Sequence, residues 1–160
     1  KWFNHAHIQK TMNSLLVEKI ESEFSEHLTL FDKEKLNTIA ELIKPRLNTL
    51  NEIYVCASFF FKTPDSYNEK HFNKLKKANF KEILSGLIEL VRSTENLAEI
   101  KPALEVLVQK NEWSFGKVMG LFRLSLVGDL SGPDLFQIAS LIGKDTCVIR
   151  MTLLNKALEN

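Results

Sequence analysis

The sequence contains few of the two residues that make tight turns. Its 160 residues include six glycines and four prolines, too few for the many short turns of a β-sandwich or barrel. No segment of useful length alternates apolar and polar residues with the period of two that a half-buried strand needs. Leucine, lysine and glutamate, which favour helix, are frequent instead. The sequence therefore predicts an all-α fold.

The chain also lacks an excess of charge of either sign. It has 21 Lys+Arg and 20 Asp+Glu, a formal net charge of +1, so nucleic acid would have to be bound by a local basic patch. Cys56 and Cys147 show no CxxC spacing, which indicates a reduced, cytoplasmic protein. No apolar run approaches the ~20 residues that span a bilayer, so we expect no membrane contact. The first residue is Lys1 rather than methionine, which suggests a piece of a longer protein.

Sequence signatures of catalysis are missing as well. The chain has neither of the glycine-rich phosphate loops, GxGxxG or GxxxxGK[ST], and no serine in a Gly-x-Ser-x-Gly context. His5 and His7 form an HxH pair, but no acidic residue or cysteine lies at a ligand spacing from them, so we expect no metal site. We expect no catalytic residue in this chain, and a binding surface remains.

Apolar residues recur every three or four positions along most of the chain, which predicts a series of amphipathic helices. The expected helices cover residues 8–24, 32–44, 47–54, 79–91, 97–110, 115–126, 133–142 and 145–158. We expect Asp32 to cap a helix and Asn79 to form a capping box with Glu82. Pro133 is preset for a helix start, and Gly143 for a left-handed helix end.

A polar stretch at residues 62–66, which contains Pro64, follows three consecutive phenylalanines at 59–61. Polar residues and proline between periodic segments mark loops and boundaries. We therefore expect two small helical bundles in series, a first subdomain at residues 1–63 and a second at 64–160.

Basic residues cluster in one stretch, interleaved with Phe72 and Phe80. Such a cluster is either a solvated helix face or a set of contacts to RNA phosphates. Its lysines are Lys70, Lys74, Lys76, Lys77 and Lys81.

Two arginines stand at predicted helix ends. Arg46 follows Pro45, which disfavours helix at the preceding residue, and its planar guanidinium there can form a bidentate contact with a base edge or pair with a carboxylate. Arg123 precedes a loop at residues 128–133. That loop could accept an unstacked RNA base, or Arg123 could simply be a cation favoured near the C-terminus of a helix.

Several motifs occur in a familiar order across the chain. Residues 2–8 read WFNHAHI, 44–46 read KPR, 59–61 read FFF, 123–128 read RLSLVG, 132–136 read GPDLF and 141–144 read LIGK. This ordered set resembles the C-terminal anticodon-binding region of bacterial glutamyl-tRNA synthetases, which are class I aminoacyl-tRNA synthetases. The resemblance covers essentially the whole chain.

The resemblance implies an α-helical cage that holds the tRNA anticodon loop. Residues 1–63 would form the stem-contact end and the first anticodon-binding bundle, and residues 64–160 the second. Arg46 would contact the third anticodon base and Arg123 the first, with Gly132 and Leu135 supporting that first base. The family often has threonine where this chain has Gly132, so a side-chain hydroxyl contact is not available at this position.

The resemblance also implies what the rest of the protein does. The parent would be a monomer that attaches glutamate to tRNA-Glu, using ATP and Mg²⁺ in an upstream catalytic domain of the same chain. The piece in hand would bind tRNA-Glu without a cofactor of its own. Two alternatives stay open. One is a helical protein-interaction module without RNA binding, which predicts an exposed apolar groove around residues 59–61. The other is the similar cage of a class I lysyl-tRNA synthetase.

Overall fold

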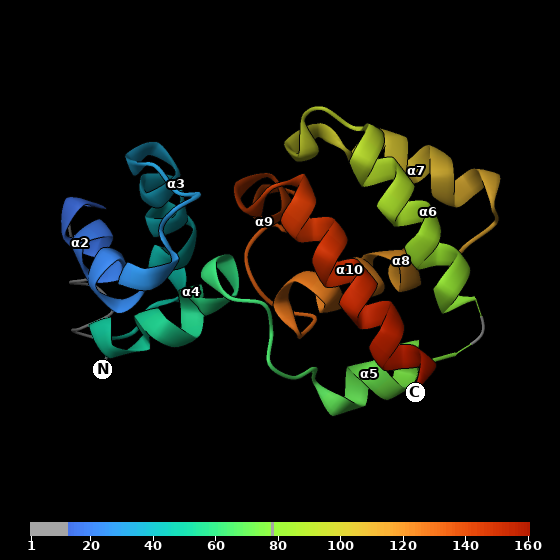
Figure 1. Ribbon diagram of the computed structural model, residues 1–160, viewed down its shortest axis with the longest axis horizontal. Helices are drawn as coiled ribbons and strands as arrows, with labels where there is room; N and C mark the ends of the chain where they lie inside the picture. The colour runs from blue at the N-terminus through green and yellow to red at the C-terminus, as the bar shows by residue number, and fades with distance from the viewer. Residues whose placement is uncertain (1–12, 78) are drawn as a thin grey trace. The chain divides into compact units, whose positions relative to one another are not determined.

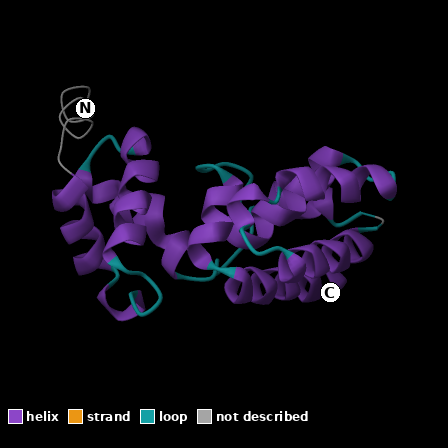
Figure 2. Ribbon diagram, turned by 90° about the horizontal axis from the view of Figure 1, so that it is seen from above, coloured by secondary structure: helices purple, strands orange, loops and turns teal. Residues whose placement is uncertain are grey.

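The computed structural model describes residues 13–77 and 79–160. Regular structure in these residues is helical throughout (Figure 2), which confirms the all-α prediction. The expected helix start at residue 8 and the His5–His7 pair lie outside the described residues. The chain divides into two compact units, Lys1–Lys62 and Thr63–Asn160. None of the described helices is long and apolar enough to cross a membrane.

The first unit is a small bundle in which α2 packs against both α3 and α4. Its described elements are α2 (Asn13–Glu23), η1 (Ser25–His27), α3 (Lys33–Ile43), η2 (Lys44–Arg46), η3 (Leu50–Glu52) and α4 (Ile53–Phe61), where η marks a short 3₁₀ helix. Asp32 caps α3 as predicted, because its carboxylate accepts a hydrogen bond from the Lys35 N–H at 2.8 Å. Ile20, Ile39 and Ile43 are fully buried between the helices.

The phenylalanine run at residues 59–61 belongs to the core of the first unit. Phe60 is 1% exposed. Phe61 stacks on Phe24 with ring centroids 4.5 Å apart and lies 4.8 Å from Phe31. Phe60 thus lies in the core, and Phe59 and Phe61 are half-buried. The run does not form the exposed apolar groove that the protein-interaction alternative expects here.

The second unit is built around α8, whose residues are mostly buried. Its described elements are α5 (Glu69–Leu75), α6 (Phe80–Ser93), η4 (Leu97–Glu99), α7 (Lys101–Lys110), α8 (Phe115–Val127), α9 (Leu135–Ile142) and α10 (Lys144–Glu159). α10 lies along α6 and α8 (Figure 1), and α8 also contacts α5, α7 and α9. Leu121, Phe122 and Met151 are fully buried where these helices meet.

Three local predictions in the second unit are wrong or incomplete. Asn79 has a φ of 67° and caps nothing with its side chain, because its carboxamide oxygen accepts from Lys117 Nζ at 2.8 Å instead. Pro133 does not start α9. The carboxylate of Asp134 caps that helix by accepting from the Gln137 N–H at 3.0 Å, so the helix begins at Leu135. Gly143 has the expected positive φ of 88°, but its ψ of 162° is extended, since α10 starts at the next residue.

Arg150 and Cys147 are enclosed in the second unit, as is Ser125 of α8. Arg150 is 2% exposed, and its Nη1 donates to the carbonyl of Leu126 at 2.6 Å, which ties α10 to the last turn of α8. Burial lowers the pKa of Arg150 to about 10. Cys147 is fully buried and its Sγ donates to the carbonyl of Ala139 at 3.6 Å. Burial raises the pKa of this thiol to about 12.

Candidate nucleic-acid interface

Arg123 lies one turn before the end of α8, and its guanidinium is held against the loop that follows. The neighbouring Phe122 and Leu124 are fully buried, whereas Arg123 itself is half-buried. Its Nη1 donates to the carbonyl of Pro133 at 2.9 Å. Because the helix is anchored on both sides of the arginine and the guanidinium is bonded to the loop, few rotamers are open to it. This is the kind of support that a base-reading side chain needs.

Gly132 places the loop backbone directly against that guanidinium. A Cβ atom at residue 132 would lie 3.1 Å from Arg123 Nη1, and the φ of Gly132 is +142°. Side chains rarely adopt such a backbone conformation. The glycine therefore permits both the conformation of the loop and its close approach to Arg123.

The side chain of Leu135 is buried, whereas a side chain that supports a base would have to be exposed. It is 2% exposed, so its isobutyl group is part of the core of the second unit. As the first residue of α9, it has a backbone N–H without an acceptor inside the helix. The buried side chain cannot contact a base, which leaves the backbone of Leu135 for the predicted role. Its role in base recognition, like those of Arg123 and Gly132, stays a prediction.

Arg46 lies in the first unit at the predicted helix break. α3 ends at Ile43, and the 3₁₀ turn η2 contains Pro45 and ends at Arg46. Ile43 and Leu47 are fully buried on either side of this turn, whereas Arg46 is exposed. The core thus fixes the backbone of the turn and directs the arginine outward.

The charges of Arg46 and Glu52 both act on the Cys56 thiol of α4. Burial chiefly raises the pKa of the Cys56 thiol, the charge of Glu52 raises it further, and the charge of Arg46 opposes them. The guanidinium therefore acts on the beginning of α4. Glu52 is itself fixed, because its Oε2 accepts from the N–H groups of Asn48 at 2.7 Å and Thr49 at 3.3 Å.

The predicted lysine cluster is exposed on α5, on the turn after it and on the start of α6. One member is engaged, since Lys81 Nζ forms an ion pair with Glu159 Oε1 at 2.9 Å. The exposed members of the cluster are Lys70, Lys74, Lys76, Lys77 and Lys81.

Lys117 belongs to the same basic surface, although the sequence pattern did not single it out. Its Nζ donates to the carbonyl of Lys77 at 3.2 Å and to Asn79 Oδ1 at 2.8 Å. Burial, and then the charge of Lys77, lowers the pKa of Lys117. It lies 38 residues beyond Asn79 in the chain, so no local pattern could reveal the contact. The ammonium fixes the turn that presents Lys76 and Lys77.

Metal ligands do not gather in the part of the chain that the structure describes. No group of three or more histidine, cysteine, aspartate or glutamate side chains there could hold an ion.

Comparison with known proteins identifies the class to which this helical chain belongs. Residues 9–154 match the sequence family described as anticodon binding domain. The chain belongs to this family. The predicted resemblance is thereby confirmed.

The relatives narrow the class to one group of enzymes. Over 94% of its length the chain is 38% identical to a glutamate–tRNA ligase from Flavobacterium johnsoniae, of which it covers 30%. A crystal structure of a glutamate tRNA ligase from Elizabethkingia meningosepticum matches 98% of the chain with a TM-score of 0.88 and 31% identity, over 32% of the solved chain. A crystal structure of a glutamate-tRNA synthetase from Elizabethkingia anophelis matches 99% of the chain with a TM-score of 0.78 and 33% identity, over 31% of the solved chain. The chain thus spans about 30% of the length of these relatives.

Proposed function

We propose that this chain selects tRNA-Glu by holding its anticodon loop. Arg46 contacts the third anticodon base and Arg123 the first, and the backbone of Gly132 and Leu135 supports the first base. The remaining contacts come from the exposed lysines of residues 70–81, which meet phosphates without reading sequence.

One observation carries this proposal, namely the fixed position of the Arg123 guanidinium. It is bonded to Pro133 at 2.9 Å and lies against Gly132, beside the first turn of α9. The guanidinium donors of Arg123 thus lie at this loop, and hydrogen-bond donors suit the acceptor groups of an unstacked base. The membership of the anticodon-binding family and the similarity to glutamate–tRNA ligases support the choice of tRNA-Glu.

The parent protein, on this proposal, is a glutamate–tRNA ligase that works in the cytoplasm as a monomer. Its ATP and Mg²⁺ would act in an upstream catalytic domain. The residues of this chain would bind and orient the tRNA, and they carry no step of the reaction. The names of the relatives support this reading, since each is a glutamate–tRNA ligase or synthetase.

Replacing Arg46 by alanine is expected to weaken the binding of tRNA-Glu about tenfold, because one base contact contributes on the order of 1–3 kcal/mol of discrimination. The same substitution should change little in the affinity for a transcript whose third anticodon base has been changed. Both affinities can be measured by fluorescence titration of the full chain.

The matched control for Arg46 is Lys19→Ala, which removes an exposed cation of α2 in the same unit. This substitution should weaken the binding of both transcripts slightly and to the same extent. Equal losses for Arg46→Ala and Lys19→Ala would count against base recognition by Arg46.

The phosphate contacts of the exposed lysines should make the affinity for tRNA depend on salt concentration. Replacing Lys74, Lys76 and Lys77 by glutamine is expected to reduce the slope of log affinity against log salt by roughly 0.7 for each phosphate that the variant no longer neutralises. The reduction should be the same for every anticodon, because phosphates carry no sequence. Titrations at two or more salt concentrations measure the slope.

An equal number of exposed lysines elsewhere in the second unit provides the control. The triple substitution of Lys101, Lys110 and Lys156 by glutamine changes the net charge by the same amount. If both triple variants reduce the slope equally, the phosphate contacts are not concentrated at residues 70–81.

A further inference from the structure

The loop of residues 128–133 is attached to the second unit at its far end by the bond between Arg123 and Pro133. Its near end is attached as well, to the segment before α5. The N–H of Asn68 donates to the carbonyl of Gly128 at 2.8 Å. Gly128 has a φ of +85°, and a Cβ there would lie 2.9 Å from the carbonyl oxygen of Ser66 and 3.0 Å from Cβ of Pro64. The segment leading into α5 is therefore pressed against the residue that ends α8.

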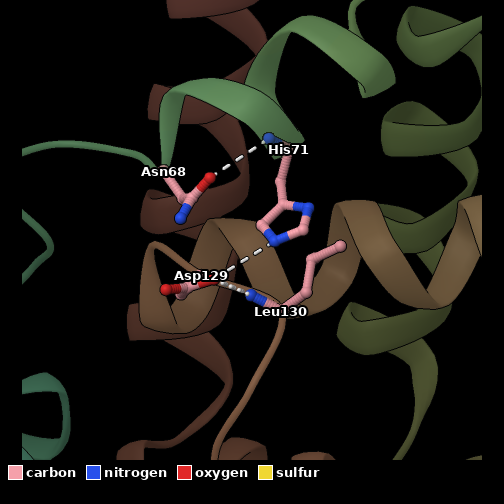
Figure 3. A network of polar contacts seen from close by, with 4 residues as sticks. All are labelled: Asn68, His71, Asp129 and Leu130. Atoms are coloured by element: carbon pink, nitrogen blue, oxygen red, sulfur yellow. Dashed lines mark hydrogen bonds and ion pairs between the residues drawn. The ribbon is translucent and has the colours of Figure 1, made fainter.

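Between these two attachments, Asp129 forms a third one. Its Oδ1 accepts from the N–H of Leu130 at 2.7 Å and lies 3.6 Å from Nε2 of His71. Figure 3 shows the imidazole pointing from α5 toward this carboxylate. The His71 side is fixed in turn, because its backbone N–H donates to Oδ1 of the capping residue Asn68 at 3.3 Å.

The packing below this contact joins the same three elements. A Cβ at Gly120 of α8 would lie 3.3 Å from the side chain of Leu75 and 3.9 Å from that of Leu130. Leu75 is the last residue of α5, and Leu130 follows Asp129 in the loop. The His71–Asp129 pair thus lies over a packed junction of α5, the loop and α8, while the loop itself continues to Gly132 and Arg123.

We propose that His71 and Asp129 are positioning residues, which hold the 128–133 loop in the conformation that presents Arg123 and Gly132 to the first anticodon base. This inference rests on the proposed function. The His71 imidazole contacts the Asp129 carboxylate, and the carboxylate holds the peptide of Leu130 through its N–H. A loop with this restraint loses less conformational freedom when it binds a base than a loop without it.

The pair has little reason to matter for global stability. The side chains of His71 and Asp129 are 28% and 46% exposed, and an ion pair in such a position contributes little to folding. The junction beneath it is apolar and does not depend on the pair. A loss of base discrimination without a loss of fold is therefore the signature of positioning.

The test uses the full chain and the discrimination ratio, which is the Kd for a transcript with a changed first anticodon base divided by the Kd for tRNA-Glu. All titrations are run at one fixed pH and one salt concentration. His71→Gln and Asp129→Asn should each lower the ratio about two- to fivefold, the range that a partly exposed ion pair allows. Asparagine at 129 keeps an acceptor for the Leu130 N–H, so that variant tests the ion pair alone.

His71→Lys should keep the ratio, because an ammonium group replaces the imidazole opposite Asp129. Any sequence-blind affinity that the lysine adds cancels in the ratio. His27→Gln, which changes an exposed histidine of the first unit, should leave the ratio unchanged. Melting temperatures of all variants are measured alongside, and we expect them to stay close to that of the parent chain.

Arg123→Lys, measured in the same series, distinguishes a failure of the positioning role from a failure of the proposed function. If Arg123→Lys lowers the ratio but His71→Gln and Asp129→Asn do not, the positioning role is wrong and the proposed function stands. If the melting temperature falls in these two variants with the ratio unchanged, the pair is structural and the positioning role is again wrong. If Arg123→Lys leaves the ratio unchanged, the proposed function fails and the positioning role fails with it.

Discussion

Replacing Arg123 by lysine should remove most of the discrimination between tRNA-Glu and a transcript with a changed first anticodon base. Lysine keeps the positive charge but not the planar, forked guanidinium, which donates to Pro133 at 2.9 Å and has further N–H donors that, on the proposed function, meet a base edge. We expect the ratio of the two dissociation constants to fall about tenfold to a hundredfold, which corresponds to the roughly 1–3 kcal/mol of a specific base contact. Fluorescence titration of both transcripts measures it.

Arg92→Lys is the matched control for this substitution, since Arg92 is an exposed arginine of α6 in the same unit. That change should leave the ratio as it is. If Arg123→Lys and Arg92→Lys behave alike, Arg123 does not read a base, and the proposed arrangement of the loop has to be abandoned.

Replacing the neighbouring Phe122 by alanine should lower the free energy of unfolding. Phe122 is fully buried between the helices that pack on α8. Removing a buried phenylalanine side chain loses its transfer free energy and leaves a cavity, which together cost about 3–5 kcal/mol of unfolding free energy. Urea denaturation followed by circular dichroism measures the loss.

Phe115→Ala provides the comparison, because Phe115 begins the same helix and is 40% exposed. Its substitution should cost clearly less, since much of that ring already contacts water. Similar losses for the two variants would mean that α8 is not packed as the structure has it.

Most of the fold follows from local patterns in the sequence. The three- and four-residue spacing of apolar side chains predicts most of the helices, because burying one face of each helix is the main gain on folding. It is wrong at residues 47–54, where Leu47 is extended and the helix is α4 at Ile53–Phe61, and it misses α5. Asp32 as a cap and the helix break at Pro45 were also predictable, since both effects act within a few residues. The family resemblance then added a function that no single pattern carried.

Some of the predictions that failed depend on the adjacent residue, as where Asp134 caps α9 next to Pro133, and others depend on distant partners. Asn79 has the right neighbours for a capping box, but Lys117 takes its carboxamide oxygen from 38 residues away. Contacts of this kind are set by the packing of helices, which the order of residues along one helix does not encode.

The site was accessible to sequence reasoning only in part. Arg46 and Arg123 could be singled out, because each stands at a helix end next to proline or a glycine-containing loop. The bond of Arg123 to Pro133 and its close approach to Gly132 required the conformation of the loop. Whether each arginine reads its base stays a prediction, and the substitutions at Arg46 and Arg123 test it.

The enclosure of Cys147 makes the two thiols of the chain chemically unequal. Burial raises the pKa of the Cys147 thiol to about 12, so this thiol is protonated at pH 7. The side chain is also fully covered. Cys56 is half-buried on α4, close enough to Arg46 for the two charges to interact. Because alkylating reagents attack thiolates that they can reach, a dye supplied to the folded chain has Cys56 as its target and therefore reports from the neighbourhood of Arg46.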